Sequence, residues 1–217
     1  MDSESGIAAS LVAGWRLRRV LYEAGISATN AREPLGDIAE ALTFLALHDG
    51  ATVDQLAASR TEAARLTHRR ADLAIPWEVL FQAIPDLRQH TPVHGAEGAP
   101  ARIQVKARYA PDSPRHIAYD AVYFSYVRGE EPEWGNDLFS LVMFGQLDEF
   151  EQGLEERNFV LTAVLITSKL LASLDNGAKS GRLDWTTIHR WYDDGLPAGA
   201  LDLTDAYRRV ALPGWGG

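Results

Sequence analysis

The chain of 217 residues contains no cysteine. This absence excludes disulfide bonds, thiolate metal sites and cysteine nucleophiles, and it is compatible with a reducing compartment. The sequence also lacks any run of 18 apolar residues, so we expect no transmembrane helix. Residues 1–5 are polar and acidic, unlike a secretory signal. We therefore expect a cytoplasmic protein that does not enter a membrane.

Several motifs of common enzyme classes are also missing. The sequence has no P-loop, no GxGxxG, no HExxH and no GxSxG, so it gives no support to the corresponding nucleotide-binding proteins, metalloproteases and serine hydrolases. The six histidines are scattered, and no two of them stand at ligand spacing on one predicted element. We therefore expect no histidine metal site.

What the chain does have is enough apolar sequence for a full core. Hydrophobic residues make up 46% of the chain and charged residues 24%, which predicts a single folded domain over 1–217. Within it we expect a helical lead-in at 1–35, the core at 36–172 and a helical or irregular extension at 173–217.

The charge is unevenly distributed along the chain. The net charge is −9, yet residues 60–115 hold nine Arg and Lys residues and six acids. A local excess of positive charge is compatible with phosphate contacts, and the acidic remainder would then face away from an anionic ligand.

One strictly alternating stretch, 102–108, is the centre of the predicted fold. Ile103, Val105 and Ala107 fall on one side of a strand, and four long polar residues fall on the other: Arg102, Gln104, Lys106 and Arg108. Period-two alternation predicts one buried face and one solvated face. Three cations without an acid between them suggest that the solvated face binds an anion.

Further elements surround this strand. Additional strands are predicted at 71–77, 121–127, 138–144 and 159–166, and helices at 7–24, 36–47 and 168–174. Residues 138–144 are nearly all apolar, as in a strand buried on both faces. Residues 185–192 are expected to pack on the sheet, and 205–210 to form a last helical turn. The fold class is therefore α/β (α+β), with a central mixed sheet of about five strands flanked by helices.

Three short motifs carry a resemblance to a known family. They are GDIAE at Gly36–Glu40 on a helix, ADL at Ala71–Leu73 on a strand, and IQVKAR at Ile103–Arg108 on a later strand. Together they resemble the core of the PD-(D/E)XK nuclease superfamily, which has the restriction-endonuclease-like fold. They are most similar to small bacterial members that pair a GDxxE helix with a QVKAR strand. The resemblance spans roughly residues 10–172.

The resemblance implies a set of site residues. Asp72 matches the first metal-binding acid, and Gln104 stands where the second acid usually stands. Lys106 matches the lysine that orients the attacking water or steadies the phosphate. Glu40 matches the helical glutamate that completes the acidic cluster. These residues would hold Mg²⁺ through oxygen ligands and waters, and Mn²⁺ is expected to substitute.

The resemblance also implies an activity and a partner. We expect a metal-dependent endonuclease, restriction-like or repair-like, that hydrolyses phosphodiester bonds of double-stranded DNA. A homodimer would allow both strands to be cut. Four arginines are expected to contact the nucleic acid: Arg69, Arg70, Arg102 and Arg108.

Two features depart from the family pattern. Gln104 is neutral, so the site has one negative charge fewer than usual, which Glu40 could compensate. The interval between Asp72 and Gln104 is long, and it requires residues 78–100 to form an excursion. Asp86, which follows Pro85, is a closer candidate for the first acid. We prefer Asp72 because no predicted strand surrounds Asp86.

Two non-enzymatic alternatives stay open. The neutral Gln104 would suit a degenerate nuclease fold that binds nucleic acid without cutting it. Alternatively, residues 52–70 can be interpreted as two short helices about a turn at Ala58–Ser59, which would make a helix-turn-helix regulator. In that case Arg65 and Arg69 would carry the binding, rather than Lys106 and Arg108.

Overall fold

The computed structural model describes eight stretches of the chain: residues 33–48, 51–66, 71–90, 98–109, 121–124, 136–144, 160–174 and 181–211. The predicted helix at 7–24 lies outside these residues. Within them, no helix is long and apolar enough to cross a membrane.

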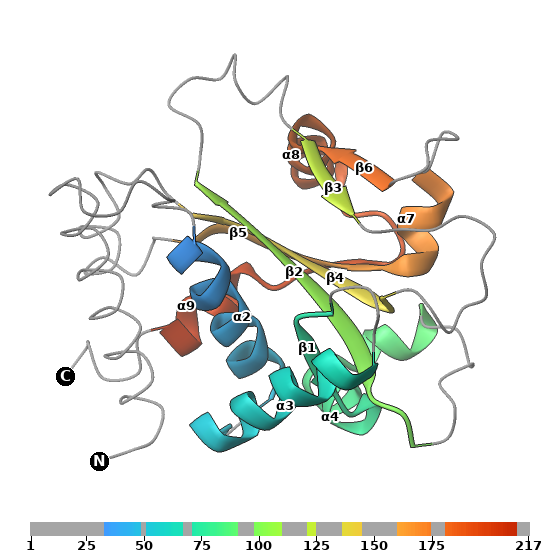
Figure 1. Cartoon of the computed structure of the whole chain (residues 1–217). Helices are drawn as coiled ribbons and strands as arrows, with labels where there is room; N and C mark the ends of the chain where they lie inside the picture. Colours follow the sequence, from blue (N-terminus) through green and yellow to red (C-terminus); the bar gives the residue numbers. More distant parts are fainter. Residues whose placement is uncertain are drawn as a thin grey trace, which may run out of the picture.

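A five-stranded mixed sheet forms the centre of the molecule (Figure 1). Its strands, in spatial order, are β1 (Leu73–Ile75), β2 (Ala101–Tyr109), β4 (Leu138–Phe144), β5 (Val160–Thr167) and β7 (Ala200–Asp202). Strands β2 and β4 are parallel, and the other neighbouring pairs are antiparallel. This confirms the predicted α/β fold with a mixed sheet of five strands and flanking helices.

The membership of the sheet differs from the prediction in one strand. β3 (Ala121–Phe124) leaves the central sheet and pairs with β6 (Gly181–Asp184) in a separate two-stranded sheet. β2 and β4 pair directly over seven consecutive positions, which leaves no edge between them for β3. The fifth place is taken by β7. Strand propensity identified residues 121–124 as extended, but propensity does not select the partner strand.

Helices cover both faces of the sheet. On one side lie α2 (Glu33–Leu47), α4 (Trp77–Ala83) and α9 (Thr204–Ala211), and α3 (Val53–Leu66) packs beside β1. On the other side lie α7 (Ser168–Leu174) and α8 (Trp185–Asp194), together with β3 and β6 (Figure 1). Residues 185–192, which were expected to pack on the sheet, form α8, and the predicted final helical turn is α9.

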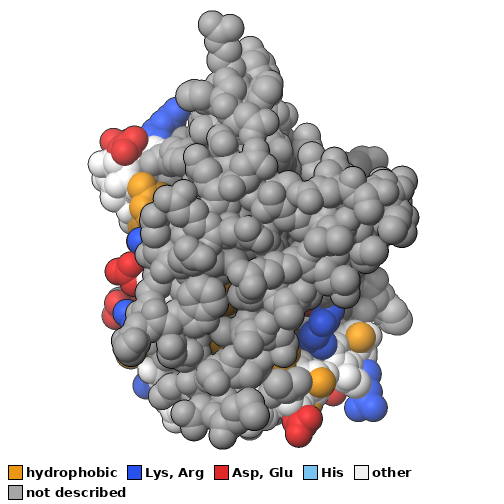
Figure 2. All heavy atoms as spheres, turned by 90° about the vertical axis from the view of Figure 1, so that its left-hand side faces the viewer, with side chains coloured by type: hydrophobic (Ala, Val, Ile, Leu, Met, Phe, Trp, Pro, Cys, Tyr) orange, Lys and Arg blue, Asp and Glu red, His pale blue; other side chains and the backbone are white. Residues whose placement is uncertain are grey.

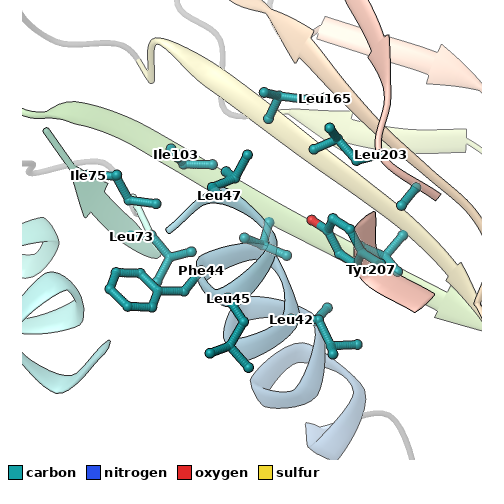
Figure 3. Close-up of a cluster of buried hydrophobic side chains, with 14 of the residues drawn as sticks. Leu42, Phe44, Leu45, Leu47, Leu73, Ile75, Ile103, Leu165, Leu203 and Tyr207 are labelled. Atoms are coloured by element: carbon teal, nitrogen blue, oxygen red, sulfur yellow. The ribbon is translucent and has the colours of Figure 1, made fainter. Parts of the chain in front are cut away.

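Two apolar clusters lie on opposite faces of the sheet. The first joins α2 and α9 to the sheet residues Ile103 and Leu165 (Figure 3). The second joins Phe139 and Leu141 to α7 and α8. β4 is buried at all seven positions because its side chains alternate between the two faces of the sheet, and each face is covered by one cluster. The predicted two-sided burial of 138–144 is therefore confirmed.

The alternative of a helix-turn-helix at residues 52–70 is wrong, because the predicted turn does not form. Residues 53–66 form one continuous helix, α3, through Ala58 and Ser59. No glycine or proline interrupts this alanine-rich segment, and alanine favours helix continuation. Thr52 and Gln55 close its N-terminus, because the Thr52 N–H donates to Gln55 Oε1 at 2.8 Å and the Gln55 N–H donates to Thr52 Oγ1 at 3.3 Å.

Candidate active site on strands β1 and β2

Asp72 directly precedes β1 and is joined to β2 by two hydrogen bonds. Its backbone N–H donates to the Ile103 carbonyl at 2.9 Å, and its carboxylate Oδ2 accepts from the Val105 N–H at 2.7 Å. The antiparallel register begins with Leu73 opposite Ile103, so Asp72 lies one residue outside it, bonded to the residues on either side of Gln104. The side chain thus takes the place of the backbone acceptor that would continue the ladder, and β2 fixes the position of the carboxylate.

Gln104 faces away from the cluster beneath α2. Its neighbours Ile103 and Val105 belong to that cluster, so alternation turns Gln104 toward the face that carries α7 and α8. Gln104 is only 1% exposed and lies next to Phe139 in the β2–β4 register. The predicted solvated face is therefore wrong at Gln104. β2 is an interior strand between β1 and β4, and the Gln104 side chain is shielded from solvent.

Lys106 lies on the same face as Gln104, one pleat repeat along β2. Two residues of a strand span about 7 Å, which a lysine side chain can bridge. Lys106 is half-buried and lies next to Leu141 in the register. Within the described ranges, no acid forms an ion pair with Lys106. Gln104 and Lys106 therefore share one face of β2, and Asp72 is bonded to the backbone of β2 between them at Val105.

Glu40 comes from a different side of the sheet. It lies on α2, which packs on the Ile103 and Val105 face, and its carboxylate forms a 3.1 Å ion pair with the Arg60 guanidinium of α3. The Glu40 side chain is 16% exposed and that of Arg60 is 49% exposed. The ion pair joins two helices, and it gives Glu40 a structural role beside the predicted one.

Helix α3 braces β1 through a residue that the sequence did not single out. The Ser59 hydroxyl donates to the Ala74 carbonyl at 2.8 Å and accepts from the Ala74 N–H at 3.0 Å. One buried hydroxyl thereby satisfies both outward backbone groups of an edge strand, which would otherwise stay open to pairing. Leu56, Ser59 and Ala63 stand at helical spacing. That spacing marks Ser59 as the polar residue on the packed side of α3.

The predicted nucleic-acid contacts divide into three cases. Arg69 and Arg70 lie outside the described residues, and so does the side chain of Arg108, although its backbone belongs to β2. Arg102 makes a two-pronged ion pair with Asp137, with its Nε 3.1 Å from Oδ2 and its Nη2 3.1 Å from Oδ1. The Arg102 N–H also donates to Asp137 Oδ2 at 2.8 Å. Asp137 therefore neutralises Arg102 at the start of the β2–β4 pair.

Asp137 is a second residue that the sequence analysis missed. Its N–H donates to the Arg102 carbonyl at 2.9 Å, and its carbonyl accepts from the Ser168 N–H at 3.0 Å. It thus connects the ends of β2, β4 and β5. An acid directly before an apolar strand is the signal that could have identified it.

The alternative first acid, Asp86, does not lie on a strand. It is exposed on a short 3₁₀ helix, η1 (Pro85–Gln89). The preference for Asp72 over Asp86 agrees with this placement.

Charged side chains of both signs lie near one another on the surface. In Figure 2, the described basic and acidic side chains at the margins of the view stand close together.

The donor set can be tested against a magnesium ion. The described residues contain no group of three His, Cys, Asp or Glu side chains that could hold a metal. Asp72 nevertheless supplies a positioned carboxylate, and the buried Oε1 atom of Gln104 accepts no hydrogen bond from the described residues, although Gln104 interacts within the molecule. Mg²⁺ is commonly held by one or two carboxylates, waters and substrate phosphates. Because the Gln104 oxygen is buried, Asp72 would be the main protein ligand of such an ion, and waters and a substrate phosphate would have to supply the rest.

No protein-family model matches the chain, and a search of curated proteins finds no match either. The functional argument therefore depends on the motifs and on the geometry of β1 and β2.

Proposed function

We propose that the protein is a metal-dependent endonuclease that hydrolyses phosphodiester bonds of double-stranded DNA. The observation that supports this proposal is that Asp72 is hydrogen-bonded to β2 on either side of Gln104, with Lys106 on the same face of β2 as Gln104. A carboxylate, an amide oxygen and an ammonium group are thus held on paired strands, where backbone hydrogen bonds limit their movement.

Each residue has a role that follows from its chemistry. Asp72 would hold the cation and position the attacking water, because its Oδ2 is already fixed by Val105. Gln104 would contribute its amide oxygen. Lys106 would bind the phosphate and stabilise the negative charge that develops in the transition state. A bound Mg²⁺ would polarise the scissile phosphate and lower the pKa of the attacking water.

Glu40 and Arg102 receive smaller parts in this proposal. Glu40 is paired with Arg60, and Arg102 with Asp137, so each would have to exchange a protein partner for the ligand. A homodimer would present two sites to the two strands of a duplex.

A second candidate function is nucleic-acid binding without cleavage. The neutral Gln104 and the Glu40–Arg60 ion pair favour it, because both reduce the negative charge available for a cation. Under this alternative, Lys106 would bind the DNA backbone, and binding would weaken steeply with salt.

A cleavage assay distinguishes the two functions. The parent protein is incubated with plasmid DNA in Mg²⁺, in Mn²⁺ or in EDTA, beside Asp72→Asn, Lys106→Met and Asp86→Asn. The variant Asp72→Asn keeps an acceptor for the Val105 N–H, so its loss of activity would reflect the charge. Asp86→Asn removes the same charge from an exposed site on η1 and serves as the control.

The expected result is metal-dependent cutting that falls by about two orders of magnitude or more in the first two variants and persists in Asp86→Asn. Salt-sensitive DNA binding with no cutting in any metal would reject the endonuclease and support nucleic-acid binding without cleavage. Cutting that survives both Asp72→Asn and Lys106→Met would place the active site elsewhere.

A further inference from the structure

We draw no further inference here: the strongest candidate, the surface patch formed by the stacked and half-buried Trp77 and Phe81 of α4 with the Arg88 guanidinium of η1 over the Phe81 ring, packs on the core beneath α4, and nothing in the described part of the structure shows what would cover it.

Discussion

The carboxylate of Asp72 accepts a 2.7 Å hydrogen bond from the backbone N–H of Val105, across the β1–β2 pair. This contact makes the candidate metal ligand a part of the sheet as well. Substitutions of Asp72 are therefore expected to change the stability of the protein and its cutting activity to different extents.

Asp72→Ala should destabilise the protein, whereas Asp72→Asn should do so less. Alanine leaves the Val105 N–H without its acceptor, at a cost of about 1–2 kcal/mol, while asparagine keeps an oxygen in place. Both remove the charge, so both should abolish metal-dependent cutting. Urea denaturation measures the difference in the free energy of unfolding. Equal stabilities for the two variants would contradict the role of the hydrogen bond.

Tyr207, which is labelled in Figure 3, belongs to a buried chain of hydroxyl groups that joins α9, α2 and β4. The Thr43 hydroxyl donates to the Ala39 carbonyl at 2.7 Å, so Tyr207 donates to Thr43 and Ser140 donates to Tyr207, each at 2.6 Å. Tyr207→Phe should lower the free energy of unfolding by about 1–2 kcal/mol. Tyr192→Phe, which removes a 3.2 Å hydrogen bond to the exposed Asp202, is the control and should cost less.

The same tyrosine predicts how stability depends on alkaline pH. Burial raises the pKa of Tyr207 from 10.0 to about 12, against the lowering effect of its hydrogen bonds with Ser140 and Thr43. Because the pKa is higher in the folded state, this stabilisation is complete below the unfolded value and is lost as the pH rises from about 10 through about 12. Denaturation across this range should show a shallower loss of stability in Tyr207→Phe. A parallel loss in parent and variant would exclude this contribution.

Two glycines with similar backbone angles are expected to differ in how much stability is lost when each is replaced by alanine. Gly199 has φ +94° and Gly195 has φ +100°. A Cβ atom on Gly199 would lie 2.7 Å from Thr167 Oγ1, whereas one on Gly195 would meet nothing within 4 Å. Gly195→Ala should therefore cost about 1 kcal/mol from backbone strain alone, and Gly199→Ala at least about 2–3 kcal/mol. Thermal melting measures both, and similar costs would refute the steric argument.

The Arg102–Asp137 ion pair predicts non-additive substitutions. The two side chains are 14% and 25% exposed, and breaking the pair leaves a largely desolvated charge. Arg102→Met and Asp137→Asn should each cost about 2 kcal/mol, and the double variant less than the sum of the two. A double-mutant cycle by urea denaturation measures the coupling. Additive costs would show that Arg102 and Asp137 do not stabilise each other.

The sequence determined the elements that depend on local pattern. Alternation located β2, and a nearly continuous apolar run located β4, because the period of burial is written in the residues themselves. The motifs also selected Asp72 over Asp86, which lies on a 3₁₀ helix rather than beside a strand.

The tertiary structure decided which elements meet. Whether β3 or β7 joined the sheet depended on the direct pairing of β2 with β4, which no local pattern encodes. The partners of Glu40 and Arg102 were likewise set by packing, since Arg60 and Asp137 lie 20 and 35 residues away along the chain. Gln104 is buried for the same reason: an alternating strand has two faces, and only the rest of the fold determines whether the polar one meets water or a second core.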